Sequence, residues 1–313
     1  MQSIVDFLYM VDDMLWGTPM VVIVLGTGIF LSLRFGFSYQ RKLKFNIKNT
    51  FGNMTSAGEG VGTVSSFRAA CTGLANTVGT GNISGVATAI VSGGPGALVW
   101  MWVSAFFGMS TKACEIILGQ RYREHYKNSM DEYVCDRSFV MKNAFGWKRG
   151  AIVLAVFAFV LGPWTCCVQT ESVTSSLLEG FNINPKISII VLGITCFATI
   201  AGGLKRISSI MEKVVPFMAM GYIIAGIGIL ILNIQNVPTA VGLIFKSAFT
   251  PMAGIGGFAG ATVKDALRYG IARGLFSNES GLGSAPLVAA AAKTKNPVRQ
   301  ALISSTGTFW DTV

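Results

Sequence analysis

The sequence predicts an all-α protein that crosses a membrane several times and contains two interrupted transmembrane helices. Three observations predict this fold class: an apolar composition, several apolar stretches long enough to span a bilayer, and glycine-rich polar segments inside two of those stretches. Hydrophobic residues make up 51% of the 313 residues and charged residues only 13%, and the mean hydropathy is +0.56. Soluble domains carry about 25% charged residues, so we expect a polytopic membrane protein.

The basic residues indicate membrane topology rather than nucleic-acid binding. The formal net charge is +10, but the Lys and Arg residues lie between the apolar stretches. Of the 25, 18 fall in four stretches, at 34–48, 120–149, 205–213 and 293–299. By the positive-inside rule these stretches are cytoplasmic, which places the N-terminus outside. We expect a multi-pass protein of the plasma (inner) membrane.

A single peripheral span is predicted at 17–36, where about 20 residues are enough to cross a bilayer. The 17 residues at the N-terminus contain Asp6, Asp12 and Asp13 but no Lys or Arg. This pattern differs from the basic start of a cleaved signal peptide.

The apolar stretch at 64–91 holds the first predicted interruption. Its glycines, Gly73, Gly79, Gly81 and Gly85, are accompanied by the polar residues Asn76, Thr77, Thr80 and Asn82. Glycine costs a helix interior about 1 kcal/mol relative to alanine. Unpaired backbone groups in lipid cost several kcal/mol each, so an unwound segment must be buried in protein or line a wet cavity. Close helix packing through a GxxxG pair, Gly81 and Gly85, is the alternative.

Four spans are predicted next, at 97–119, 150–180, 187–203 and 214–232. Lys112 and Glu115 are spaced i, i+3 and are expected to pair on one helix face. A helical stripe of polar residues, expected to face the bundle interior, is formed by Thr165, Gln169, Ser172 and Ser176. The stripe could line a site, for which the primary amide of Gln169 offers donors and an acceptor. Interhelical hydrogen bonding remains the alternative.

A surface helix and loop at 237–258 precede the second interrupted stretch, at 261–292. Its segment GLFSNESGLG, at 274–283, echoes GLANTVGTG at 73–81, and Arg268 and Arg68 precede the two copies. The topology makes the two stretches run in opposite directions. Two glycine-interrupted segments in opposed halves indicate the binding site of a secondary transporter. A further apolar span begins after Pro297.

The sequence gives little support to an enzymatic, metal-binding or cofactor-binding function. The six cysteines lack CxxC spacing and are expected to be free packed thiols, and the one histidine, His125, lies in a charged loop. There is no HExxH, no GxSxG and no pair of intramembrane aspartates, so we expect neither an enzyme, nor a transition-metal site, nor a cofactor. The TVGTG segment at 77–81 resembles the TVGYG filter of potassium channels, which leaves an ion channel as an alternative.

Four segments resemble the alanine or glycine:cation symporter family, also described as sodium:alanine symporters or amino acid carrier proteins. They are TVGTGNISGVATAI (77–90), GGPGALVWMW (93–102), RGLFSNESGLGSAP (273–286) and AAAKTKNPVRQ (290–300). The resemblance implies a leucine-transporter-like fold, with broken helices in a five-plus-five inverted repeat. It implies one transmembrane domain over 1–313, with the first repeat at 64–232 and an incomplete second repeat at 261–313. An inactive truncated fragment is therefore an alternative to an active symporter.

The resemblance also implies that the protein takes up a small neutral amino acid, alanine or glycine, together with sodium. The substrate contacts implied are Asn76, Thr77, Gly79, Thr80, Gly81, Asn82, Gln169, Phe276 and Asn278. Sodium prefers oxygen ligands, and the candidates are Thr77, Thr80 and Glu279. Because a carboxylate inside a bilayer is costly, Glu279 is expected either to pair with Arg273 or Arg268 or to take part in coupling.

Overall fold

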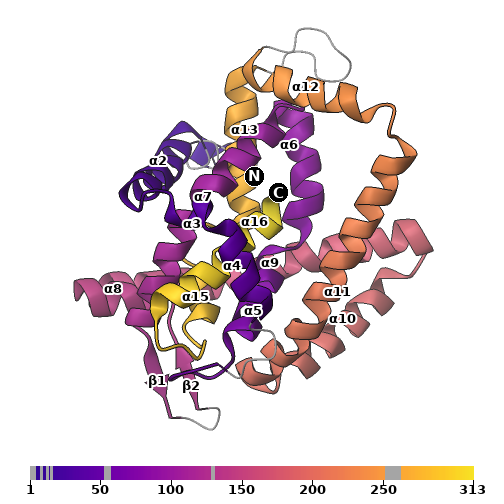
Figure 1. Cartoon of the computed structure of the whole chain (residues 1–313). Coiled ribbons are helices and arrows are strands. Elements are labelled where there is room, and N and C mark those ends of the chain that lie inside the picture. Colours follow the sequence, from indigo (N-terminus) through magenta and orange to yellow (C-terminus); the bar gives the residue numbers. More distant parts are fainter. Residues whose placement is uncertain are drawn as a thin grey trace.

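The structure is a computed structural model that is helical over most of its length (Figure 1). It describes residues 5–7, 10–11, 14, 17–52, 58–127, 131–250 and 262–313. In this part of the chain, two helices are long and apolar enough to cross a membrane, α9 (Lys148–Phe181) and α11 (Gly203–Leu232). Three shorter apolar helices, α2, α10 and α12, accompany them.

The predicted peripheral span is α2 (Thr18–Arg34), which packs against α7 (Ala97–Arg121). At the contact, a Cβ atom on Gly28 would lie 3.1 Å from the Cβ of Phe107, so glycine allows the two helices to approach closely. Two short helices follow, α3 (Ser38–Arg41) and α4 (Leu43–Gly52).

The first predicted interruption is confirmed. Helix α5 (Ser66–Thr77) ends where Val78 becomes extended, with ψ 107°. One π-helical turn, η1 (Gly81–Gly85), then leads into α6 (Val86–Gly93). Such π-helical turns are rare and occur frequently at functional sites. We call residues 78–85 the first break.

Helix α7 is the central helix and contacts α2, α13, α14, α15 and α16. Small residues on α7 make these close contacts possible, because a larger side chain at their positions would collide with a neighbouring segment. A Cβ atom on Gly119 would lie 2.7 Å from the Cβ of Pro286, and one on Gly108 would lie 3.0 Å from the Oγ of Ser280.

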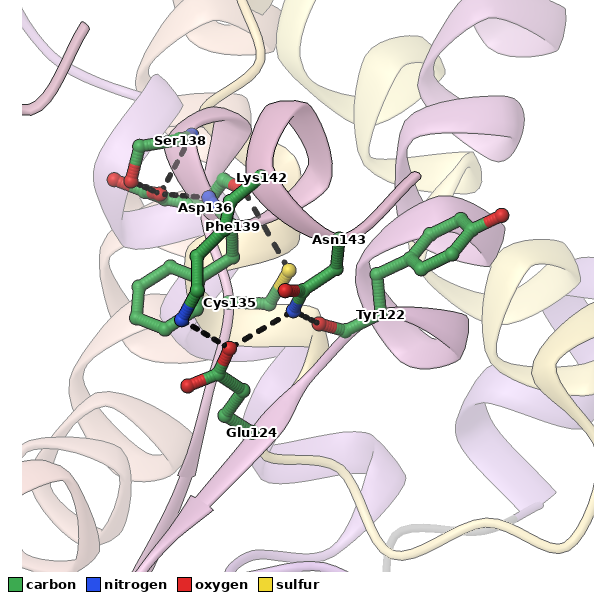
Figure 2. A network of polar contacts seen from close by, with 8 residues as sticks. All are labelled: Tyr122, Glu124, Cys135, Asp136, Ser138, Phe139, Lys142 and Asn143. Atoms are coloured by element: carbon green, nitrogen blue, oxygen red, sulfur yellow. Dashed lines mark hydrogen bonds and ion pairs between the residues drawn. The ribbon is translucent and has the colours of Figure 1, made fainter. Parts of the chain in front are cut away.

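The stretch at 120–149, predicted to be a solvated connection, folds into a small unit. Strand β1 (Glu124–Tyr126) pairs antiparallel with β2 (Glu132–Val134), and α8 (Arg137–Phe145) follows. Figure 2 shows the polar network that joins them. The Glu124 carboxylate accepts hydrogen bonds of 2.9 Å from both Lys142 and Asn143, and the bond from Lys142 lowers the pKa of Glu124. Asp136 caps α8 by accepting from the backbone N–H groups of Ser138 and Phe139. We call residues 122–147 the loop unit.

Three long helices come next: α9 (Lys148–Phe181), α10 (Pro185–Ile200) and α11 (Gly203–Leu232). Helix α10 packs against both of its neighbours, and α11 returns to α5. The predicted span at 214–232 lies within α11, which starts eleven residues earlier and continues through the basic stretch. Pro216 therefore lies inside it, near the buried Val215.

The second interrupted stretch follows α12 (Val237–Phe249), which confirms a helix in the stretch predicted to hold one, while its place at the membrane surface stays a prediction. The loop part of that prediction, 251–258, lies outside the described residues. Helix α13 (Val263–Asn278) begins with a capping box formed by Thr262 and Asp265. The chain after α13 contains α14 (Ala285–Ala289), α15 (Pro297–Ser304) and α16 (Thr306–Thr312).

The two interrupted stretches run in opposite directions, as predicted. Helix α13 lies along α6 (Figure 1), and α14 contacts α5, so the start of each stretch meets the end of the other. Between α13 and α14, residues 279–284 leave the helix, and Glu279 has a left-handed backbone with φ 53°. We call residues 276–284, the C-terminal end of α13 together with this segment, the second break. The division of the chain into two five-helix repeats stays a prediction.

The loop unit yields a testable prediction at Cys135, a free thiol with 1% of its surface exposed. Burial raises its pKa to about 12, so little reactive thiolate forms at pH 8. We expect N-ethylmaleimide to leave Cys135 unlabelled in the folded protein and to label it after denaturation, as measured by peptide mass spectrometry. A cysteine introduced by Phe145→Cys, at an exposed position of α8, serves as the labelled control. Equal labelling of both sites in the folded protein would contradict the buried position of Cys135.

Candidate binding site at the two helix breaks

The two breaks touch each other, and Asn82 forms the main link. Its side-chain Oδ1 accepts a 2.8 Å hydrogen bond from the Gly79 N–H within the first break. Its Nδ2 donates to the Ser277 Oγ at 3.0 Å, and to the carbonyl and carboxylate oxygens of Asp311 at 2.7 and 3.0 Å. One amide thus joins the first break to the end of α13 and to α16.

Asp311 is a site residue that sequence reasoning missed. It is only 9% exposed, and its Oδ2 accepts from the Ser277 hydroxyl at 2.8 Å. The available signal was an acidic residue inside the apolar span that begins after Pro297, because charges in such spans are costly. The sequence alone does not show that this carboxylate reaches the two breaks.

Gly81 brings the backbones of the breaks close together. A Cβ atom at this position would lie 3.3 Å from the Cα of Ser277 and 3.4 Å from the Cδ1 of Phe276. Phe276 itself is 42% exposed beside this contact. The GxxxG interpretation therefore holds for Gly81, which packs closely against the second interrupted stretch.

Gln169 is the member of the polar stripe that reaches the site. Its Oε1 accepts from the Thr80 N–H at 3.3 Å, and a Cβ atom on Gly79 would lie 2.8 Å from its Nε2. The expectation that the whole stripe faces the bundle interior was wrong for this chain. Thr165 and Ser176 are exposed and donate to carbonyl groups of their own helix, α9.

Glu279 has partners other than the predicted arginines. Its Oε2 accepts from the Nδ2 of Asn76 at 2.7 Å and from the hydroxyl of Ser284. The expected pairing with Arg273 or Arg268 was wrong, because α13 ends at Asn278 and neither arginine lies one helical turn before Glu279. Asn76, predicted as a substrate contact, is thus held by the second break.

Asn278 and Thr77 also make structural contacts. The fully buried Asn278 accepts from the Ser280 N–H at 3.0 Å and donates to the Thr312 hydroxyl at 3.4 Å. The Thr77 hydroxyl donates to carbonyl groups of its own helix, α5, at 3.3 and 3.5 Å. Both residues therefore shape the breaks in this conformation.

A small cavity lies beside the second break, between α5, α7, α14 and α16. Its volume is about 30 Å³, and its polar lining is formed by Asn76, Thr77, Lys112, Ser284 and Ser304. A buried water needs about 10–15 Å³, so the cavity has room for about two water molecules. An amino acid would require the surrounding helices to separate.

The geometry predicts that Asn82 is needed for the stability of the fold. Asn82→Ala leaves the Gly79 N–H and oxygens of Ser277 and Asp311 without their partner, at a cost of about 1–3 kcal/mol per buried group. We expect the melting temperature of the purified protein to fall by about 5 °C or more. Asn233→Ala, which removes an exposed amide bonded only to its own helix at Ile229, is the matched control. Similar shifts for the two variants would contradict the role of Asn82.

Comparison with known proteins identifies the family. The family model described as the sodium:alanine symporter family matches residues 1–313. The chain is 46% identical over 311 residues to the sodium/alanine symporter AgcS of Methanococcus maripaludis, covering 97% of the chain and 66% of that protein. It is 43% identical over 316 residues to an uncharacterized transporter of Haemophilus influenzae, covering 99% of the chain and 68% of that protein.

A putative sodium/proton-dependent alanine carrier protein of Bacillus subtilis, YrbD, is 36% identical over 314 residues, covering 98% of the chain and 62% of that protein. The chain thus spans about two thirds of the length of these relatives. These matches give no support to the ion-channel alternative. The chain belongs to the sodium:alanine symporter family, whose members are membrane transporters and not enzymes.

Proposed function

We propose that the protein takes up a small neutral amino acid, alanine or glycine, together with sodium, by alternating access in the plasma (inner) membrane. The observation that carries this proposal is the contact between two oppositely running helix breaks, made by Asn82 and Gly81 with Ser277. The family, whose members include a sodium/alanine symporter and a putative alanine carrier protein, supports transport of this class. Because the chain spans about two thirds of its relatives, uptake by this chain alone is part of the proposal.

The first break suits the carboxylate of an amino acid. Helix N-termini attract anions through free N–H groups, and η1 and α6 begin at this break. The Thr80 N–H now donates to the Gln169 amide oxygen over 3.3 Å, a long hydrogen bond. A substrate carboxylate could take that N–H and accept a second bond from the Gln169 NH₂. Phe276, whose ring packs beside Gly81, would cover the side chain of a small substrate.

The second interrupted stretch suits positive charge. Helix C-termini present carbonyl groups that attract cations, and α13 ends at Asn278 beside the first break. The substrate ammonium and the coupling ion are thus expected near this end. Asn76, one residue before Thr77, binds the Glu279 carboxylate, so the end of α5 lies beside this carboxylate. We propose Thr77 and Glu279, with Thr80, as oxygen ligands for sodium.

Uptake of radiolabelled alanine and glycine in membrane vesicles tests this proposal, with sodium and proton gradients imposed separately. We expect saturable uptake driven by the sodium gradient. Loss of a hydrogen bond to a charged group costs about 1.5–3 kcal/mol, so Gln169→Ala is expected to raise KM for alanine about 10- to 100-fold. Thr165→Ala, one turn earlier on α9 and bonded to its own helix, is the matched control with unchanged uptake.

The full-length relative from Methanococcus maripaludis is a positive control for the vesicles. Electrical conductance without saturable uptake would contradict the symporter and favour a channel. Uptake driven by the proton gradient alone would mean that protons, and not sodium, are the coupling ion. No uptake by this chain, with activity in the relative, would contradict independent transport by these 313 residues.

Glu279→Gln tests the proposed role of this carboxylate in coupling. The amide can still accept from Asn76 and Ser284, so the fold is expected to remain, but the negative charge that attracts sodium is lost. We expect the sodium dependence of alanine uptake to weaken at least tenfold, measured as the sodium concentration for half-maximal rate. Glu179→Gln, at an exposed position of α9, is the control. Unchanged sodium dependence would remove Glu279 from the ion site.

A further inference from the structure

The second break leaves backbone groups that neither α13 nor α14 can satisfy, because helix ends lack intrahelical partners. Four of these groups bond to charged side chains from elsewhere in the chain. They are the carbonyl oxygens of Asn278 and Leu282 and the N–H groups of Gly281 and Gly283. Side chains from α7 and α8 therefore complete the hydrogen bonding of the break.

Helix α7 provides two of these side chains. The Lys112 Nζ donates to the Asn278 carbonyl oxygen at 2.9 Å, and Lys112 is only 5% exposed. One turn later, the Glu115 Oε1 accepts from Gly281 and Gly283 at 3.0 and 2.9 Å. Lys112 and Glu115 attract each other, as expected for a pair on one helix face, but they form no direct ion pair, because each side chain binds a different part of the break.

Helix α8 provides the third side chain. The Arg137 Nη1 donates to the Leu282 carbonyl oxygen at 2.7 Å. Glu115 and Arg137 thus bind three successive residues of the break through groups of opposite charge. Gly283 also packs on this arginine, since a Cβ atom there would lie 3.2 Å from the Arg137 Cβ.

Arg137 connects the break to the loop unit. It is the first residue of α8 and follows the helix cap Asp136. Figure 2 shows that α8 is fastened to strand β1 by the contacts of Glu124 with Lys142 and Asn143. The position of Arg137 is therefore determined by a folded unit and not by a free loop.

The break needs this support because its backbone is unusual. Gly281 and Gly283 have φ values of +99° and +74°, which L side chains rarely adopt. A glycine segment without bound partners has many accessible conformations, and fixing its backbone costs about 1–2 kcal/mol per residue. Charged side chains make stronger hydrogen bonds than neutral ones and can hold one conformation.

We propose that Lys112, Glu115 and Arg137 are positioning residues that hold the second break in the shape required by the binding site. They contact the backbone at 278–283, directly after Ser277, which binds Asn82 of the first break. The effect on transport rests on the proposed function. The effect on the break itself does not depend on any substrate.

Hydrogen–deuterium exchange of the purified full chain, followed by mass spectrometry of peptides covering 279–285, tests the proposal directly. In Glu115→Leu, the amides of Gly281 and Gly283 lose their acceptor, and we expect them to exchange about tenfold faster or more. Glu115→Gln keeps an oxygen acceptor of the same reach and is expected to restore slow exchange to within about threefold. Thr111→Val, one turn earlier on α7, keeps the side-chain shape and is the matched control with unchanged exchange.

Arg137→Met provides a second test on another element. We expect faster exchange over 279–285 in this variant and recovery in Arg137→Lys, which keeps a donor. Unchanged exchange in both Glu115→Leu and Arg137→Met would overturn the proposal. If Glu115→Leu does not fold, the comparison of Arg137→Met with Arg137→Lys alone tests the proposal.

Alanine uptake separates positioning from general destabilisation. Glu115→Leu and Arg137→Met are expected to raise KM about tenfold while changing kcat less than threefold, and the conservative variants are expected to restore KM. Normal KM in variants with fast exchange would overturn the effect on the site. A third outcome is that the exchange rates change as expected but the unsubstituted chain shows no uptake. This result would contradict the proposed function and still support the positioning role.

Discussion

Backbone hydrogen bonding inside a membrane is the constraint on which this structure depends. Lipid offers no partner for a peptide N–H or C=O group, so each interruption of a helix has to be satisfied by protein. At the first break, the amides of Asn82 and Gln169 accept from the N–H groups of Gly79 and Thr80. At the second break, Glu115 and other charged side chains take this role. The two breaks therefore differ in chemistry, neutral in one case and charged in the other.

This difference agrees with the proposed function. A break satisfied by neutral amides can exchange one of them for a substrate carboxylate without leaving a buried charge unpaired. A break held by charged groups is harder to open, because removing one partner of a buried charge is strongly destabilising. The first break is thus suited to binding and release, and the second to a fixed frame. Helix α7 makes the frame possible, since Gly108 and Gly119 let the second interrupted stretch approach it closely.

The helix interruptions could be predicted from the sequence because glycine and asparagine clusters inside apolar stretches are a local signal. The spans at 97–119, 150–180 and 187–203 were also predictable from length and hydrophobicity. The partners of polar side chains could not be predicted from the sequence. Glu279 was assigned to the nearest arginines in sequence, and Lys112 to Glu115, whereas the structure pairs them with residues more than 160 positions away. A single sequence contains no information on which helix faces meet, and the folded loop unit was missed because its strands are only three residues long.

We propose that the contact between the two breaks forms the binding site. Disulfide crosslinking tests it most directly, with Gly81→Cys and Ser277→Cys in a chain whose six cysteines are replaced by alanine. A Cβ atom at Gly81 would lie 3.3 Å from the Cα of Ser277, so the two backbones are in direct contact at these positions. We expect rapid crosslinking in native membranes and slower crosslinking when alanine and sodium are present. We also expect the crosslinked protein to lose sodium-dependent alanine binding. Absence of the crosslink, or unchanged alanine binding by the crosslinked protein, would contradict it.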